Sequence, residues 1–294
     1  MSLREPQDRL NSAKAFCRKH GIPIKGIKPL RLRFNSLFRV PAEHLVLRVH
    51  NAATAFEDVK RELDIAQHLA RNSVPTPAAL KGAEDVYWSG MHFVTAWEYL
   101  QPGPAPEAPE GQFGDLLRQF YIAMESFEPP LPPFAPLKDA LFQVRSLSIK
   151  PEARAFLEDA IATCVADLNF CTAADAMRPI HGDAHEGNVI WVGGTGFLID
   201  FEAVSNGSIE NDIAPMIITK RRFRPDLDLE SFVARVAPRI DIGAIHPAIV
   251  RARELRMVVW LAKSAKGSDD LHTEFERRLE NLSNQDNTAA WVPK

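Results

Sequence analysis

The stretch IHGDAHEGNVIW, residues 180–191, gathers chemically active side chains within a few positions and has apolar residues at both ends. Its ionisable and amide-bearing members are His181, Asp183, His185, Glu186 and Asn188. Such a cluster suits three uses: ligation of a metal ion, transfer of protons, or a polar turn without chemistry. The neighbouring sequence helps to decide among them.

The residues that follow predict a short hairpin. The apolar run VIWV, 189–192, reads as a strand directly after Asn188, and GFLID, 196–200, reads as a second strand that ends in Asp200. The Gly-Gly pair 193–194 between them favours a tight turn. Asn188 and Asp200 are therefore expected side by side at one end of the hairpin. Their oxygen atoms suit Mg²⁺, which proteins hold with a few oxygens together with substrate phosphates.

The first hundred residues predict a small antiparallel sheet with two helices. Apolar residues at helical spacing predict helices over 3–20 and 54–72. Alternating segments predict strands at 27–34, 37–42 and 44–50, and a hairpin over 85–100 that turns at Ser89 and Gly90.

The remainder predicts a mostly helical region. Residues 101–111 are rich in proline and read as a linker. Helices are predicted over 112–127, 137–147, 151–170, 226–237, 245–265 and 270–283. The fold class predicted from this order is α+β.

Composition limits the classes of partner. The chain has 294 residues, a net charge of −3 and 25% charged residues, which favours neither a nucleic-acid nor a membrane-surface binder. No apolar run approaches the ~20 residues of a membrane span. Three cysteines without metal-ligand spacing and a charged N-terminal stretch favour a reducing, cytoplasmic location. We expect a monomer or homodimer.

The order and spacing of the polar residues resemble the aminoglycoside phosphotransferase family, which is related to protein kinases and choline kinases. The resemblance rests on HGD at 181–183 with Asn188 five positions after Asp183, on IDFE at 199–202, and on NDIA at 211–214. It extends to HLVLRV, VPTP and WEYLQPG in the first half, and thus touches most of residues 34–214.

The resemblance implies a two-lobed, protein-kinase-like fold with the nucleotide between the lobes. The small antiparallel-sheet lobe would span 1–98, a hinge 99–103, and the mostly helical lobe 104–294. Asp183 would be the catalytic base, or the group that orients the acceptor hydroxyl. Asn188 and Asp200 would hold magnesium.

Other roles follow from the same resemblance. His181 and Asp212 would support the catalytic loop, and candidate contacts to the substrate are His185, Glu186 and Glu202. The nucleotide would be bound by Asn35 and Ser36 in the phosphate loop, by Arg48 with its partner Glu62, and by the hinge residues Glu98, Tyr99 and Leu100. The phosphate loop departs from the family pattern, because it reads LRFNSLFRV without glycine.

The function so implied is transfer of the γ-phosphoryl group of ATP, with GTP as an alternative donor, to a hydroxyl of a small molecule. The acceptor is an antibiotic, as in resistance kinases, or a metabolite such as a sugar, amino alcohol or nucleoside. Two alternatives remain: a nucleotide-binding pseudokinase, and a transition-metal hydrolase that uses His181, Asp183 and His185.

The sequence also carries an expectation about the charge of the acceptor. The densest basic cluster contains Lys220, Arg221, Arg222 and Arg224. If it faces the cleft, it repels a polycation, which predicts a neutral, zwitterionic or singly charged acceptor.

Overall fold

The computed structural model describes residues 5–80, 86–171, 177–265 and 268–293. The chain divides into two compact units. The first combines Met1–Glu107, Gln119–Pro129 and Gly187–Ala203, and the second combines Ala108–Arg118, Pro130–Glu186 and Val204–Lys294. No helix of the described residues is long and apolar enough to cross a membrane.

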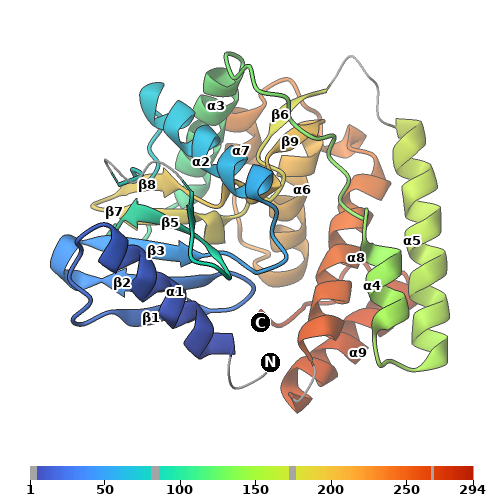
Figure 1. Ribbon diagram of the computed structural model, residues 1–294. Helices are drawn as coiled ribbons and strands as arrows, with labels where there is room; N and C mark the ends of the chain where they lie inside the picture. Colours follow the sequence, from blue (N-terminus) through green and yellow to red (C-terminus); the bar gives the residue numbers. More distant parts are fainter. Residues whose placement is uncertain (1–4, 81–85, 172–176, 266–267, 294) are drawn as a thin grey trace. The chain divides into compact units, whose positions relative to one another are not determined.

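The first unit contains a five-stranded antiparallel sheet (Figure 1), in the spatial order β1-β2-β3-β5-β4. The strands are β1 (Lys28–Leu32), β2 (Ser36–Val40), β3 (Leu45–Val49), β4 (Tyr87–Trp88) and β5 (Phe93–Glu98). All three predicted strands and the hairpin at Ser89 and Gly90 are therefore present. Pro29 lies in the edge strand β1, where a residue without an N–H group is tolerated.

The two faces of this sheet differ in character. Helix α1 (Glu5–Lys19) lies across one face, where Phe16 packs with strand residues such as Phe38 and Leu47 in an apolar cluster. Side chains alternate along a strand, so Arg48 and Val46 belong to the opposite face. Helix α2 (Phe56–Arg71) carries the buried Glu62, which contacts Arg48. The predicted helices 3–20 and 54–72 are thus confirmed within a few residues.

The predicted hairpin after Asn188 belongs to the first unit. It consists of β7 (Val189–Val192) and β8 (Thr195–Leu198), paired antiparallel. Gly193 and Gly194 join the strands with φ values of 56° and 83°, a left-handed conformation that favours glycine. The N–H of Ile199 donates to the carbonyl of Asn188 at 3.0 Å, so the ends of the strands meet as predicted.

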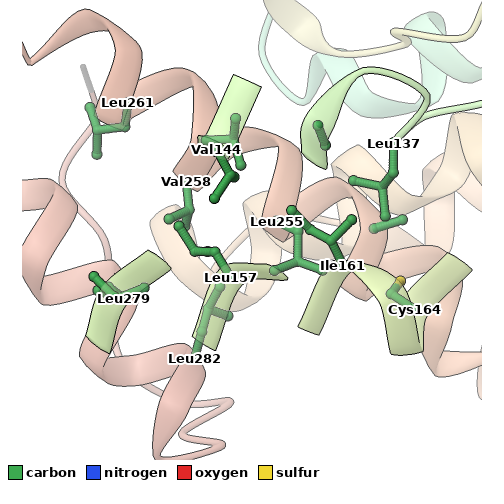
Figure 2. Close-up of a cluster of buried hydrophobic side chains, with 14 of the residues drawn as sticks. Leu137, Val144, Leu157, Ile161, Cys164, Leu255, Val258, Leu261, Leu279 and Leu282 are labelled. Atoms are coloured by element: carbon green, nitrogen blue, oxygen red, sulfur yellow. The ribbon is translucent and has the colours of Figure 1, made fainter. Parts of the chain in front are cut away.

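Helices dominate the second unit. They are α4 (Ala140–Ser146), α5 (Pro151–Cys171), α6 (Glu210–Ile218), α7 (Leu229–Val236), α8 (Pro247–Ser264) and α9 (Asp269–Ser283), and β6 (Arg178–Ile180) pairs with β9 (Ser205–Gly207). Helix α3 (Pro109–Met124) contributes its first half to this unit and its second half to the first unit. Figure 2 shows the core between α4, α5, α8 and α9, where Leu157, Leu255 and Leu282 are buried together.

Two helices differ from the sequence prediction. Helix α3 begins at Pro109, inside the stretch predicted as a linker; proline is well tolerated in the first turn of a helix. Helix α6 was not predicted, because Pro215 interrupts its pattern of backbone hydrogen bonds from within. The chain continues from α6 into a π-helical turn, Thr219–Phe223.

A buried histidine gives the first unit a predicted pH dependence. His50 is 1% exposed, and its Nε2 lies 3.1 Å from Thr95 Oγ1. Burial, together with the positive charge of Arg48, lowers the pKa of His50 to about 3. His50 therefore binds a proton near pH 6.5 in the unfolded chain, whereas in the folded chain it binds that proton only near pH 3. Stability from this group is complete above pH 6.5 and falls as the pH decreases.

We expect acid to destabilise the wild type more than His50→Asn, by up to about 1.4 kcal/mol per pH unit below pH 6. Urea unfolding of both proteins between pH 7.5 and 4.5 measures this. The difference between the two curves isolates His50, because every other titrating group is shared. Parallel curves would contradict the prediction.

Candidate functional site

The HGD loop is held by a buried carboxylate of the second unit. Asp212, in the first turn of α6, is fully buried, and its two oxygens accept the N–H groups of His181 and Gly182 at 2.7 and 2.8 Å. Gly182 has φ 77°, a conformation that a side chain would strain. His181 is also fully buried. Asp212 therefore makes the contacts that support of this loop requires.

The Asp183 carboxylate lies among positive groups. Its Oδ1 forms an ion pair with Arg253 Nη1, and its Oδ2 lies 3.8 Å from Nε2 of His185. Burial alone would raise the pKa of Asp183, but the charges of Arg253 and Arg256 hold it well below its usual range. Asp183 is consequently ionised at neutral pH. A base of such low pKa is better suited to orienting a hydroxyl than to removing its proton early.

Arg253 and Arg256 belong to the candidate site but were not predicted from the sequence. Both belong to α8, three positions apart, which places them on one face of the helix. In the sequence they are two of many arginines interleaved with acids. Their spacing is the available signal, but nothing in the sequence indicates that this face meets the HGD loop.

Glu186 lies in a separate acidic pair bridged by an arginine. Its two oxygens accept from Arg224 Nη1 at 3.0 and 2.7 Å, and Arg224 Nη2 lies 2.6 Å from Glu110. Arg224 thus forms ion pairs with two acids of the protein itself. The predicted contact between Glu186 and the substrate has to share that carboxylate with Arg224.

Two further members of the basic cluster are also engaged with the protein, whereas Arg221 is exposed. Arg222 is 1% exposed, and its Nε donates to Glu254 at 2.8 Å. Lys220 Nζ donates to the carbonyl of Leu227 at 2.7 Å. Three of the four charges of this cluster are therefore bound to the protein, and the expectation about the charge of the acceptor stays a prediction. The positive groups beside the Asp183 carboxylate are Arg253 and Arg256 of α8.

In the first unit, one arginine is shared by three acids. Arg48 Nη1 lies 2.8 Å from Glu62, and both Nη atoms lie 3.1 Å from Asp200 Oδ1. Glu202 accepts from Nη2 as well, so this candidate substrate contact lies beside Arg48. Burial raises the pKa of Glu62 to about 7, against the lowering by Arg48. Three acids thus surround a single guanidinium group, an excess of acidic over basic groups that favours a bound cation.

Asp200 and Asn188 are placed to hold such a cation. Asp200 has φ 69°, an uncommon backbone conformation that recurs at functional sites. Asn188 is 6% exposed and is joined to Ile199 by the hydrogen bond at the end of the hairpin. One amide and one carboxylate fit Mg²⁺, which usually takes its other ligands from water and phosphate.

The transition-metal alternative finds no support. Among the residues with described positions, no group of three or more His, Cys, Asp or Glu side chains is arranged to hold a metal ion. His181 is buried, and Asp183 is paired with Arg253.

A cavity of about 200 Å³ extends from Arg48 across the face of the sheet opposite α1, within the first unit. Its apolar walls include Leu37, Val46, Trp97, Ile190 and Ile199, and its charged end contains Arg48, Glu62 and Asp200. The predicted hinge residues Glu98, Tyr99 and Leu100 also line it. An apolar slot with charges at one end suits a flat base that carries phosphates.

The hinge backbone is already partly used. The N–H groups of Glu98 and Tyr99 donate to the carbonyls of Ala78 and His44, at 2.8 and 2.7 Å. Contacts to a base are therefore left to the hinge carbonyls and to the N–H of Leu100.

The two phosphate-loop candidates are bound to the protein itself. Asn35 is 6% exposed, donates to Glu202 at 3.0 Å and accepts the N–H of Asn51 at 3.0 Å. Ser36 is fully buried, and its Oγ accepts from Arg9 at 3.0 Å. Phosphate contacts from this loop would then come from its backbone. Their nucleotide role stays a prediction.

Comparison with known families gives this arrangement a name. Residues 29–255 match the model of the phosphotransferase enzyme family known as APH, which is well over half of the chain. The chain belongs to this family. The resemblance seen in the sequence is thereby confirmed. A comparison with curated proteins gives no match.

Solved structures of this phosphotransferase fold are similar over nearly the whole chain. Amicoumacin kinase hAmiN in complex with AMP-PNP, Ca²⁺ and Ami has a TM-score of 0.78 at 12% identity, over 99% of this chain and 98% of that one. A microcompartment-associated aminopropanol kinase has a TM-score of 0.70 at 17% identity, over 94% and 98%. A choline/ethanolamine kinase family protein from Mesorhizobium loti has 0.66 at 16%, over 93% and 94%.

These comparisons confirm the predicted α+β, kinase-like fold class. At such low identity the structural likeness establishes the fold alone. The division into lobes at 1–98, 99–103 and 104–294, and the individual site roles, stay predictions. So do the cytoplasmic location and the monomeric or dimeric state.

Proposed function

We propose that this phosphotransferase moves the γ-phosphoryl group of ATP to a hydroxyl of a small molecule. One observation carries the proposal: Arg48, in ion pairs with Glu62 and Asp200, lies at the charged end of the apolar cavity. The apolar part of this cavity would take the base, Arg48 would contact the phosphates, and Asp200 would contact a cation. The named relatives support a nucleotide donor, because amicoumacin kinase was solved with AMP-PNP.

In the proposed reaction, Asp183 accepts a hydrogen bond from the acceptor hydroxyl and aims its oxygen at the γ-phosphorus. A new oxygen–phosphorus bond forms as the bond to the β–γ bridging oxygen breaks, and ADP leaves. The hydroxyl proton passes through Asp183 to water. Arg48 neutralises phosphate charge, and Asp212 holds the loop in register.

Asn188 and Asp200 would hold Mg²⁺, which neutralises the phosphate oxygens when bound. The pseudokinase alternative is weakened because Asp183, Asn188 and Asp200 are all present. GTP remains a second donor to test, since structural relatives include kinases solved with GDP.

The acceptor is an antibiotic or a metabolite. Both classes occur among structural relatives, which include an amicoumacin kinase and an aminopropanol kinase. An antibiotic acceptor would make the protein a resistance factor.

ADP release over a panel of hydroxylated antibiotics, sugars, amino alcohols, hydroxy acids and nucleosides tests the proposal, with ATP and GTP assayed separately. We expect at least one acceptor that releases ADP and gains a phosphate detectable by mass spectrometry. Arg48→Met should suppress this release, whereas Arg71→Met, at the exposed end of α2, should not. Nucleotide binding without ADP release on any acceptor would favour the pseudokinase.

A further inference from the structure

Two guanidinium groups of α8 lie beside the Asp183 carboxylate. Arg253 contacts Asp183 directly, and the charge of Arg256 acts on the same carboxylate. Both side chains are half-buried, and they lie on one face of the helix. Arg253 is only 18% exposed in its side chain, so its charge is largely withdrawn from water.

A small hollow lies between this helix face and the HGD loop, within the second unit. Gly182, Asn211, Arg253 and Arg256 line it, with Phe134, Pro136 and Ile249 as apolar walls. Its volume is about 10 Å³. That is room for about one water molecule, or for a single oxygen atom of a ligand.

The balance of charge here favours an anion. Of the other acids at the loop, Glu186 is paired with Arg224, and Asp212 directs both oxygens to backbone N–H groups. Asp183 is therefore the carboxylate that faces the two arginines. A guanidinium group has five donors in a planar fork, so pairing with Asp183 leaves Arg253 with donors for a second oxyanion. A cationic acceptor would instead meet two like charges at the catalytic carboxylate.

We propose that the acceptor of this phosphotransferase carries an oxyanion, a carboxylate or phosphate group, and that Arg253 and Arg256 recognise it. The inference rests on the proposed function, because it treats that anion as part of the phosphorylated molecule. A guanidinium group can bind either a carboxylate or a phosphate through two parallel hydrogen bonds. The acceptor hydroxyl would then be positioned at Asp183 by the anion a short distance away. This narrows the acceptor class to hydroxy acids and their phosphate counterparts.

A simpler role for the pair has to be separated from recognition. If Arg253 only positions Asp183, replacing it lowers kcat for every acceptor alike. If the arginines bind an anion, Arg256→Gln raises KM for acids much more than KM for their neutral partners, while any change in kcat is common to both. A change in kcat for all acceptors therefore indicates positioning of Asp183, and a change in KM that is much larger for acids indicates recognition of the anion.

The experiment uses matched pairs of probes, each an acid and a neutral partner: glycerate and glyceramide, 4-hydroxybutyrate and 4-hydroxybutyramide, and glycerol 3-phosphate and glycerol. ADP release gives kinetics, and calorimetry on the protein saturated with AMP-PNP and Mg²⁺ gives binding without turnover. Lys263→Gln is the matched control. It removes one exposed charge from the same helix, about 15 Å from Arg253.

We expect an acid to be preferred over its neutral partner, and Arg256→Gln to weaken the acid at least ~10-fold, as loss of a charge-assisted hydrogen bond implies. Lys263→Gln should leave that preference intact. The carboxylate and phosphate pairs show which oxyanion is recognised.

Equal binding of acids and neutral partners, or a preference unchanged by Arg256→Gln, would overturn the inference. Phosphorylation of neutral or cationic acceptors alone would overturn it while the proposed phosphotransfer stands. Arginine-dependent binding of acids without any phosphate transfer would support anion recognition and count against the proposed function instead.

Discussion

Asp183→Asn is expected to reduce turnover by at least ~10²-fold, because an amide cannot accept the proton of the acceptor hydroxyl. The substitution preserves the volume of the side chain. It also removes the negative partner of Arg253, so a modest loss of stability, of about 1–3 kcal/mol, should accompany it. The protein should still fold, since the loop is held from Asp212 and not from Asp183.

Steady-state ADP release with the best acceptor of the panel, well below the melting temperature of both proteins, measures the effect. Asp115→Asn is a suitable control. It removes one half-exposed carboxylate of the same unit, whose partner Arg235 is 3.4 Å away. Circular dichroism establishes folding. A folded Asp183→Asn protein with full activity would remove Asp183 from the mechanism.

Much of the fold was predictable because the pattern of apolar residues is local. The stripe of α2 and the alternation in β2 each bury one face of their own element, so a window of about ten residues contains the signal. The β7–β8 hairpin was equally clear from its Gly-Gly turn. Helix α6 was hidden because Pro215 contradicts local helix propensity, and only tertiary packing compensates for it.

The candidate site likewise contains residues that the sequence predicts and residues that it does not. Arg48 and Glu62 are recognisable because each stands in a motif, and the structure shows them as an ion pair. Arg253 and Arg256 stand in no motif. Their meaning depends on which face of α8 meets the HGD loop, a contact across 70 residues that periodicity alone does not encode. The same holds for Asn35 and Ser36, whose partners Glu202 and Arg9 are distant in the chain.

Asp200→Ala is expected to abolish the magnesium dependence of nucleotide binding. This carboxylate is the charged member of the proposed Mg²⁺ pair, and removing it should weaken binding of ATP with magnesium at least ~10-fold. Asn188→Ala should weaken it less, because a neutral amide oxygen holds a cation less strongly. Calorimetry with ATP, in the presence of magnesium and of a chelator, gives both quantities.

Asp200 also lies 3.1 Å from both Nη atoms of Arg48, so loss of this ion pair is a competing cause of weaker binding. Glu202→Gln separates the two effects. It removes the same charge from the neighbourhood of Arg48, but Glu202 is not a proposed metal ligand. If the metal is decisive, magnesium still strengthens ATP binding in Glu202→Gln and no longer does so in Asp200→Ala. If both variants keep the magnesium effect, Asp200 does not hold the metal; if both lose it, the charge around Arg48 governs binding, because that charge is what the two substitutions share.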